Sequence, residues 1–113
     1  MLLEESYMYT SNTKTIYGMS FEWDEKKAAA NIVKHDVSFE EASSVFIDEY
    51  ARIIDDPEHS LDEERFIILG MSRRARALVV CHCYRNDDET IRIISARKAT
   101  RREEQSYWRL RHA

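Results

Sequence analysis

Apolar residues follow two different spacings along this chain of 113 residues. Helical spacing over about 24–35 and 38–46 predicts two helices, and a third is predicted after Thr100. Alternation, or a short continuous apolar run, predicts strands at residues 21–23, 51–54, 65–71, 77–84 and 90–96. This order predicts an α+β fold: a short N-terminal strand, two helices, an antiparallel four-stranded meander and a C-terminal helix.

The first predicted helix begins after Asp24, a residue type whose side-chain oxygen caps helix N-termini. Ala28, Ala29, Ile32 and Val33 recur at the spacing of one helix face. We therefore expect these four residues to form the stripe that packs on the core.

Two further helix starts carry the capping-box pattern, a Ser or Thr followed three residues later by Glu. Ser38 pairs in this way with Glu41, and Thr100 with Glu103. In each box the two side chains are expected to satisfy two backbone N–H groups that the helix leaves unpaired.

Two cations, Arg97 and Lys98, stand where the last predicted strand ends and the C-terminal helix is about to begin. A sheet on one side and the Thr100 cap on the other would hold this backbone. An Arg fork and a Lys ammonium in such a place are well suited to grip a phosphate. The alternative is that both are ordinary solvated loop charges.

The net charge of −4 hides an uneven distribution. Residues 1–70 contain 6 Lys and Arg against 16 Asp and Glu, a net charge of −10. Residues 71–113 contain 11 against 5, a net charge of +6. This asymmetry favours a cationic surface for an anionic ligand on an otherwise acidic protein, or two faces that neutralise each other within the fold.

Residues 1–18 show no apolar period and are rich in Ser and Thr, so we expect a disordered or loosely attached extension before a single domain at 19–113. Glu4 and Glu5 stand where a signal peptide would have its basic start. No apolar run approaches the length that crosses a bilayer. Two cysteines two residues apart make no disulfide framework, which favours a reducing, cytoplasmic location.

The segment Cys81-His82-Cys83 offers three metal-ligating residue types in a row. On a strand the two thiols face one way and the imidazole the other, so the three cannot converge on one ion. We therefore expect no metal here, and buried thiols in a central strand instead.

Aromatic residues on the C-terminal helix allow two interpretations. Tyr107 and Trp108 could stack on the bases of single-stranded RNA. Alternatively, Tyr107 and Leu110 dock the helix onto the sheet and leave its arginines to solvent or a partner.

Several separated motifs together resemble the BrnT toxins, the toxin half of a bacterial type II toxin–antitoxin pair. The likeness runs from about Phe21 to Tyr107 and is carried by Phe21-Glu22-Trp23-Asp24, Lys27, Asn31, Lys34-His35, Val37-Ser38-Phe39-Glu40-Glu41-Ala42, Asp56-Pro57-Glu58-His59-Ser60, Glu64-Arg65-Phe66 and Arg92-Ile93-Ile94-Ser95-Ala96-Arg97-Lys98-Ala99-Thr100. One departure is Asp36, where the family usually has Gly. Asp tolerates the left-handed backbone better than most residues, so we expect the turn to survive.

The resemblance implies a fold like that of the RelE ribonucleases and RNA cleavage that arrests translation and growth, with no cofactor. It also implies neutralisation by a BrnA-type antitoxin that carries a ribbon-helix-helix DNA-binding domain, so operator DNA is bound only through the antitoxin. The ribosome is a further possible partner.

Cleaving RNA without a metal needs a proton acceptor for the 2′-OH, cations for the developing phosphorane charge and an acid for the leaving oxygen. The candidate catalytic residues are Lys34, His35, His59, Glu64, Arg65 and Arg97. We expect Arg97 and Arg65 to hold the scissile phosphate, with His59 or Glu64 as proton acceptor. Lys34 or His35 completes the cluster. The candidate RNA-binding residues are Lys98, Arg101 and Arg102.

Each candidate also has a structural interpretation. His35 stands at a helix C-terminus, where the dipole favours a cation. His59 is ordinary turn surface by composition, and Glu64 with Arg65 makes an ion pair of small net value. The alternative function is accordingly a non-catalytic module that holds nucleic acid or a protein on its basic C-terminal surface.

Overall fold

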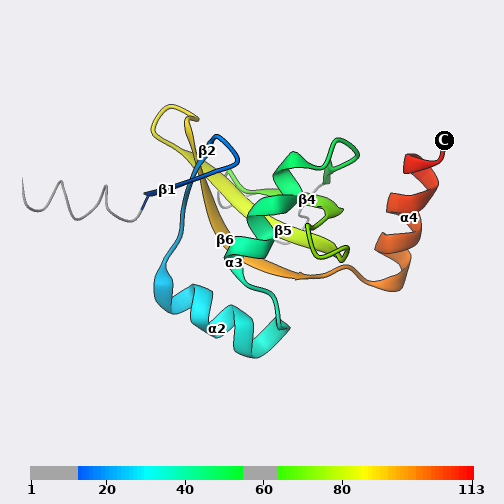
Figure 1. Cartoon of the computed structure of the whole chain (residues 1–113), viewed down its shortest axis with the longest axis horizontal. Helices are drawn as coiled ribbons and strands as arrows, with labels where there is room; N and C mark the ends of the chain where they lie inside the picture. Colours follow the sequence, from blue (N-terminus) through cyan, green and yellow to red (C-terminus); the bar gives the residue numbers. More distant parts are fainter. Residues whose placement is uncertain (1–12, 55–63) are drawn as a thin grey trace, which may run out of the picture.

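The computed structural model of the chain describes residues 13–54 and 64–113, which form one sheet flanked by helices (Figure 1). The elements in chain order are β1 Thr13–Ile16, β2 Met19–Glu22, α2 Glu25–His35, α3 Phe39–Ser43, the 3-10 helix η1 Ser44–Ile47, β3 Arg52–Ile54, β4 Phe66–Met71, β5 Ala77–Arg85, β6 Thr90–Lys98 and α4 Arg101–Arg111.

The six described strands form a mixed sheet in the order β1-β2-β6-β5-β4-β3. Strands β3 to β6 pair antiparallel in chain order. Strand β2 pairs parallel with β6, and the long connection between them in the chain runs through α2 and the strands that follow it. The α+β class is confirmed. The predicted sheet was incomplete, because it lacked β1 and the parallel pairing that makes the sheet mixed.

The expectation of a disordered extension over residues 1–18 is wrong for its last part. Residues 13–16 form β1, which pairs antiparallel with β2 in the register Ile16↔Met19. Tyr17 and Gly18 connect the two strands, both with positive φ (55° and 75°), the backbone of a tight hairpin turn. The Tyr-Gly pair indicated a turn, but the prediction for this segment relied on composition alone. Residues 1–12 lie outside the described part of the chain.

The sheet carries a different core on each face. On one face, α2, α3 and η1 cover the larger cluster, in which Val80 and Ala96 lie side by side on β5 and β6. On the other face, Tyr107 of α4 packs on Leu69 and Val79. Because side chains alternate along a strand, the two faces are separate environments. Figure 1 shows α4 well apart from α2.

Helix α2 buries only one residue of the stripe that was expected. Ala28 is buried as predicted, together with Asn31. Ala29, Ile32 and Val33 are exposed, Val33 to 89%. The Asn31 amide donates to the carbonyls of Val37 (2.9 Å) and Ala96 (2.8 Å), and it accepts from the Ala96 N–H (3.1 Å). These three hydrogen bonds turn a polar residue inward and rotate the apolar pair to the surface.

Asp36 caps α2 in the left-handed conformation at φ 58° and ψ 36°, so the expected turn is present without glycine. Ser38 caps α3 by accepting from the Glu41 N–H, but the Glu41 side chain does not return to close the box. It is buried and accepts from the Ser72 hydroxyl at 2.6 Å and from the Arg76 guanidinium instead. The Ser38 cap was therefore predicted correctly and the reciprocal half was not.

Candidate functional site

Arg97 lies one residue before the end of β6, on the sheet face that α4 covers, because it pairs with Val79 of that face. Its guanidinium holds the Glu103 carboxylate with two parallel hydrogen bonds, Nη1 to Oε1 at 2.8 Å and Nη2 to Oε2 at 3.0 Å. The hydrogen bonds from Arg97 lower the pKa of Glu103 to about 2, and the same contact raises the pKa of Arg97. Both groups are charged throughout the physiological range.

The backbone around Arg97 is held from both directions. Before it, the N–H and the carbonyl of Ala96 both form hydrogen bonds with the Asn31 side-chain amide. Strand β2 pairs only with residues 90–92 of β6, so Asn31 supplies the hydrogen bonds that a neighbouring strand would make here. After it, Thr100 and Glu103 complete the predicted capping box, with the Thr100 N–H donating to Glu103 at 2.8 Å. One carboxylate therefore caps α4 and orients Arg97.

The contacts of Arg97 leave a defined part of its guanidinium available. Nη1 uses one hydrogen toward Glu103 and donates to the Lys98 carbonyl at 3.3 Å, while Nη2 uses one toward Glu103. Within the described part of the chain, Nε–H and the second hydrogen of Nη2 have no partner. Together they form the side edge of the fork, which matches two phosphate oxygens. Its side chain is 40% exposed, so a ligand can reach that edge.

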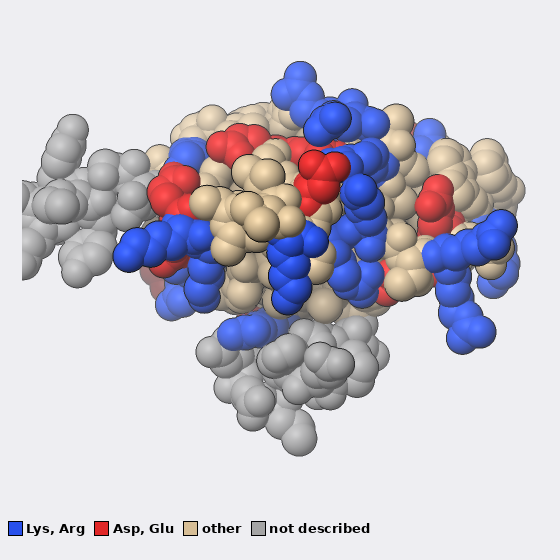
Figure 2. Space-filling view, turned by 90° about the horizontal axis from the view of Figure 1, so that it is seen from below, with Lys and Arg blue, Asp and Glu red and all other residues tan. Residues whose placement is uncertain are grey.

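Other cations gather where β6, α4 and the β4–β5 turn meet. Lys98 is exposed, alternates to the opposite sheet face from Arg97 and lies 3.8 Å from Asp36. Arg101 and Arg102 are exposed on the first turn of α4. From the β4–β5 turn comes Arg74, 68% exposed. Figure 2, which views the molecule from below, shows many basic side chains with some acidic ones among them. The cations named here lie near the strand end that carries Arg97, and they attract an anion toward it.

Another arginine of the β4–β5 connection, Arg76, is structural. Burial raises the pKa of Glu41, but hydrogen bonds from Arg76 and Ser72 outweigh that effect and lower it. Arg76 also donates to the Asp36 carbonyl at 2.8 Å, so it joins α2, α3 and the turn. No sequence pattern had marked this network, since its partners are 31 and 35 residues apart.

The structure brings together only part of the predicted catalytic set. Glu64 is exposed and Arg65 half-buried just before β4, and continuing the alternation of β4 by one residue assigns Arg65 to the face of Arg97. Lys34 and His35 end α2, which covers the opposite face. His59 lies outside the described residues. A single cluster of all six is therefore not visible in the described part of the chain.

The spacing between the two arginines follows from the sheet register. Arg97 pairs with Val79, and a continued β4 would place Arg65 two same-face rows further along and two strands across. Strand geometry makes this roughly 16 Å between the Cα atoms. Two extended arginine side chains can approach one phosphate across that distance, each toward a different oxygen.

The prediction for Cys81-His82-Cys83 was that side chains on alternate faces of a strand cannot converge on one metal ion. The side chains of β5 alternate between the two faces as predicted. His82 is fully buried on the face of Val80, among the rings of Phe46, Phe66 and Tyr84. Burial lowers the pKa of His82, and its Nε2 has no hydrogen-bond partner in the described structure. No group of three or more His, Cys, Asp or Glu side chains that could hold a metal occurs among the described residues.

The last helix is docked by one of the two residues proposed for it. Tyr107 is buried and donates its hydroxyl hydrogen to Asp48 at 2.7 Å, whereas Leu110 is 47% exposed, so its predicted docking role is wrong. Burial raises the pKa of Asp48, but hydrogen bonds from the Met71 N–H and Tyr107 outweigh this and lower it. None of the described helices is long and apolar enough to cross a membrane.

These features define a small α+β protein with an oriented arginine at a cationic edge, a class suited to binding a phosphate-bearing ligand. Residues 23–103 match the family model described as "Ribonuclease toxin, BrnT, of type II toxin-antitoxin system". The match spans most of the chain, so the protein belongs to the BrnT family of ribonuclease toxins.

A solved structure shows the same fold. The 1.1 Å crystal structure of the Brucella abortus ribonuclease toxin BrnT superposes with a TM-score of 0.54 at 22% sequence identity, covering 70% of this chain and 94% of that chain. No curated protein matches this chain. The predicted family is thus confirmed by a match of sequence and by a likeness of fold.

Proposed function

We propose that this chain is a metal-independent endoribonuclease that cleaves RNA to arrest translation, with Arg97 as the residue that grips the scissile phosphate. The observation that carries the proposal is the Glu103-oriented guanidinium, exposed at the cationic edge with its side edge unpaired among the described residues. A guanidinium held in advance loses little freedom when it binds a phosphate. Family membership supports ribonuclease chemistry.

The reaction that fits this site uses the nucleophile that RNA itself carries. The ribose 2′-oxygen attacks phosphorus, its proton passes to a base, and the bond to the 5′-oxygen breaks as that oxygen takes a proton from a general acid or from water. The products are a 2′,3′-cyclic phosphate and a 5′-hydroxyl. No water needs activation by a metal. Arg97 and Arg65 would stabilise the negative charge that develops on the phosphorane oxygens.

Proton transfer is assigned to the remaining candidates of the proposal. His59 and Glu64 both stand before Arg65 in the sequence, and one of them is proposed as the acceptor of the 2′-OH proton. Lys34 and His35 lie across the sheet from Arg97, so we propose for them contact with a neighbouring part of the RNA or with a partner. Lys98, Arg101 and Arg102 would contact phosphates on either side of the cleaved link.

Several finer points of the proposal rest on the family alone. The fold is proposed to be RelE-like, and the inhibitor to be a BrnA-type antitoxin with a ribbon-helix-helix domain, which would bring the toxin to operator DNA. The ribosome is proposed as a possible partner, and the cytoplasm as the location. Residues 1–12 are proposed as an extension outside the toxin domain.

The test is cleavage of an end-labelled RNA by the purified chain, with and without ribosomes and in the presence of EDTA. Arg97→Ala should reduce cleavage by at least a hundredfold, since one oriented cation on a developing charge is worth about 3 kcal/mol. Arg97→Lys should keep the charge and lose the fork, with intermediate activity.

The matched control is Arg85→Ala, which removes an exposed arginine at the end of β5, where it pairs with Thr90 at the start of β6. Seven residues of strand separate Thr90 from Arg97, roughly 23 Å. Full activity of Arg97→Ala contradicts the proposal, as does cleavage that EDTA abolishes. RNA binding without cleavage by the unaltered chain would instead establish the non-catalytic binding module.

A further inference from the structure

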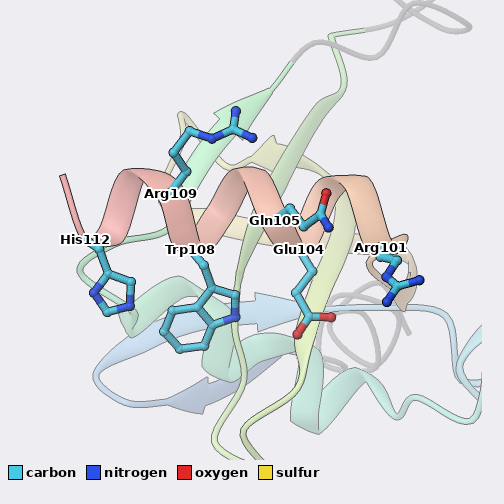
Figure 3. A pocket seen from close by; sticks show the side chains of 6 residues that line it. All are labelled: Arg101, Glu104, Gln105, Trp108, Arg109 and His112. Carbon is cyan, nitrogen blue, oxygen red and sulfur yellow. The ribbon is translucent and has the colours of Figure 1, made fainter.

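The outer side of α4 forms an open concavity of about 690 Å³, and of its lining residues the proposed function uses only Arg101. The described residues that line it come from one stripe of the helix: Arg101, Glu104, Gln105, Trp108, Arg109 and His112. Figure 3 shows Arg101, Glu104, Trp108 and His112 projecting in a row from the same side of α4. Every described lining residue is charged, polar or aromatic, and none is aliphatic.

The aromatic end of this row is oriented before any ligand arrives. The rings of Trp108 and His112 are nearly parallel, 15° apart with centroids 5.4 Å from each other. Tyr107 meets Trp108 edge-on at 5.4 Å, and the Arg111 guanidinium lies 4.9 Å from the Trp108 ring centroid. Trp108 also packs against the smaller core cluster. A flat ligand therefore finds a rigid, partly stacked platform.

Charge surrounds this platform in a pattern that suits a nucleotide chain. Arg101 lies at one end of the row and can meet a phosphate, Arg109 projects from the other side of the helix near Trp108, and Glu104 stands between Arg101 and the rings. A lone carboxylate among arginines opposes phosphate binding but accepts hydrogen bonds from base N–H groups. Single-stranded RNA is read at such unstacked base edges.

The stripe is continuous with the Arg97 site. Glu103, which holds Arg97, neighbours Glu104 on the first turn of α4, and Trp108 lies one turn further along. From residue 103 to residue 108 the helix rises about 7.5 Å. At 100° per residue the two positions also differ by about 140° around the helix axis. A strand of RNA gripped at Arg97 would therefore follow the surface of α4 to reach the rings.

We propose that this stripe binds the single-stranded RNA that flanks the scissile phosphate, with one base stacked on the Trp108–His112 pair and its Watson–Crick edge facing Glu104. This inference rests on the proposed function and adds its sequence preference. A carboxylate takes two parallel hydrogen bonds from guanine, through N1–H and the N2 amino group, and only one from uracil. The structure thus assigns a preference for guanine over uracil at the stacked position.

Binding is tested with a short 2′-O-methyl RNA, which cannot be cleaved through the 2′-oxygen. Affinity is measured by fluorescence anisotropy for oligonucleotides with guanine or uracil at one position. Trp108→Leu keeps an apolar side chain against the core and should weaken binding about tenfold, the cost of one stacked base. His112→Ala and Arg109→Ala lie at exposed positions where folding is not at stake, and each should weaken binding severalfold. Glu104→Gln should remove the difference between guanine and uracil.

Arg85→Ala is the control for the loss of one positive charge away from the stripe. If Trp108→Leu, His112→Ala and Arg109→Ala all bind this RNA as tightly as the control, the inference is overturned. The same result combined with weaker antitoxin binding assigns the stripe to a protein partner. A complete lack of RNA binding by the unaltered chain counts against the proposed function itself, so the two failures are distinguishable.

Discussion

Glu103 does two things at the scale of a single residue: it caps α4 through the Thr100 N–H and it fixes the fork of Arg97. Its pKa of about 2, against an ordinary 4.5, means that the folded state favours the carboxylate. The stabilisation is complete above about pH 4.5 and is lost as the pH falls through about 2.

We expect Glu103→Gln to lower the free energy of unfolding at pH 7 by about 1–2 kcal/mol. The loss is modest because solvent around the half-exposed Arg97 screens the ion pair, and because Gln can still cap the N-terminus of α4. The difference from the unaltered chain should shrink as the pH falls from 4.5 toward 2. Urea denaturation at a series of pH values measures it. Glu104→Gln, one residue along and outside the ion pair, is the control, and an equal loss in both variants would contradict the assignment.

His82 gives a pH dependence of the same sign in a higher pH window, because it is a base buried in its neutral form among three aromatic rings. Burial lowers its pKa, so below about 6.5 the unfolded chain binds a proton that the folded chain refuses. Stability is full above that pH and declines below it, by at most about 1.4 kcal/mol per pH unit.

His82→Phe removes this titration while keeping an aromatic ring. Its thermal midpoint should vary less between pH 6.5 and 5 than that of the unaltered chain. His112→Ala, an exposed histidine on α4, should leave the dependence as it was. A His82→Phe profile that runs parallel to the unaltered chain would show that His82 is not the group responsible.

At the scale of elements, the fate of α2 shows what the sequence could and could not predict. The helix, its Asp24 cap and its left-handed end at Asp36 followed from local chemistry, and all three are present. The buried stripe did not, because Asn31 is drawn inward by the Ala96 backbone, 65 residues away. Local spacing carries no information about such a partner.

The candidate site divides in the same way. The position of Arg97 at a strand-to-helix junction and the Thr100–Glu103 box could be predicted from local sequence, the box from residues three apart. That the Glu103 carboxylate also binds Arg97 could not, nor that α2 lies across the sheet from it. Which face a residue occupies depends on register, and register is fixed by distant strands.

Asn31 therefore offers a test of how α2 supports the site. Asn31→Ala leaves the Ala96 N–H and two carbonyls without their buried partners, and we expect a loss of about 2–4 kcal/mol in the free energy of unfolding. Lys34→Ala, exposed on the same helix, should change it by less than about 0.5 kcal/mol. Chemical denaturation of the two variants decides, and a loss below 1 kcal/mol for Asn31→Ala would contradict the assigned role.

At the scale of the whole molecule, the net charge of −4 would repel a polyanion, so RNA binding has to depend on where the positive charge lies. The acidic half supplies α2 and α3, and the basic half supplies β5, β6 and α4. The cations near Arg97 are thus a local surface on an acidic protein. Such a surface attracts RNA only at short range, within about a Debye length of 8–10 Å.

This arrangement predicts a definite salt dependence. If Arg97, Lys98, Arg101 and Arg102 each meet one phosphate of single-stranded RNA, the logarithm of the association constant should fall against the logarithm of salt concentration with a slope of about −3. Arg97→Ala should reduce the steepness by about 0.7, since one released counterion is lost. Arg85→Ala, at the far hairpin, should leave the slope unchanged even though it alters the net charge equally. Titrating 2′-O-methyl RNA at four salt concentrations measures all three slopes. Equal flattening by both substitutions would mean that total charge, and not the surface around Arg97, governs binding.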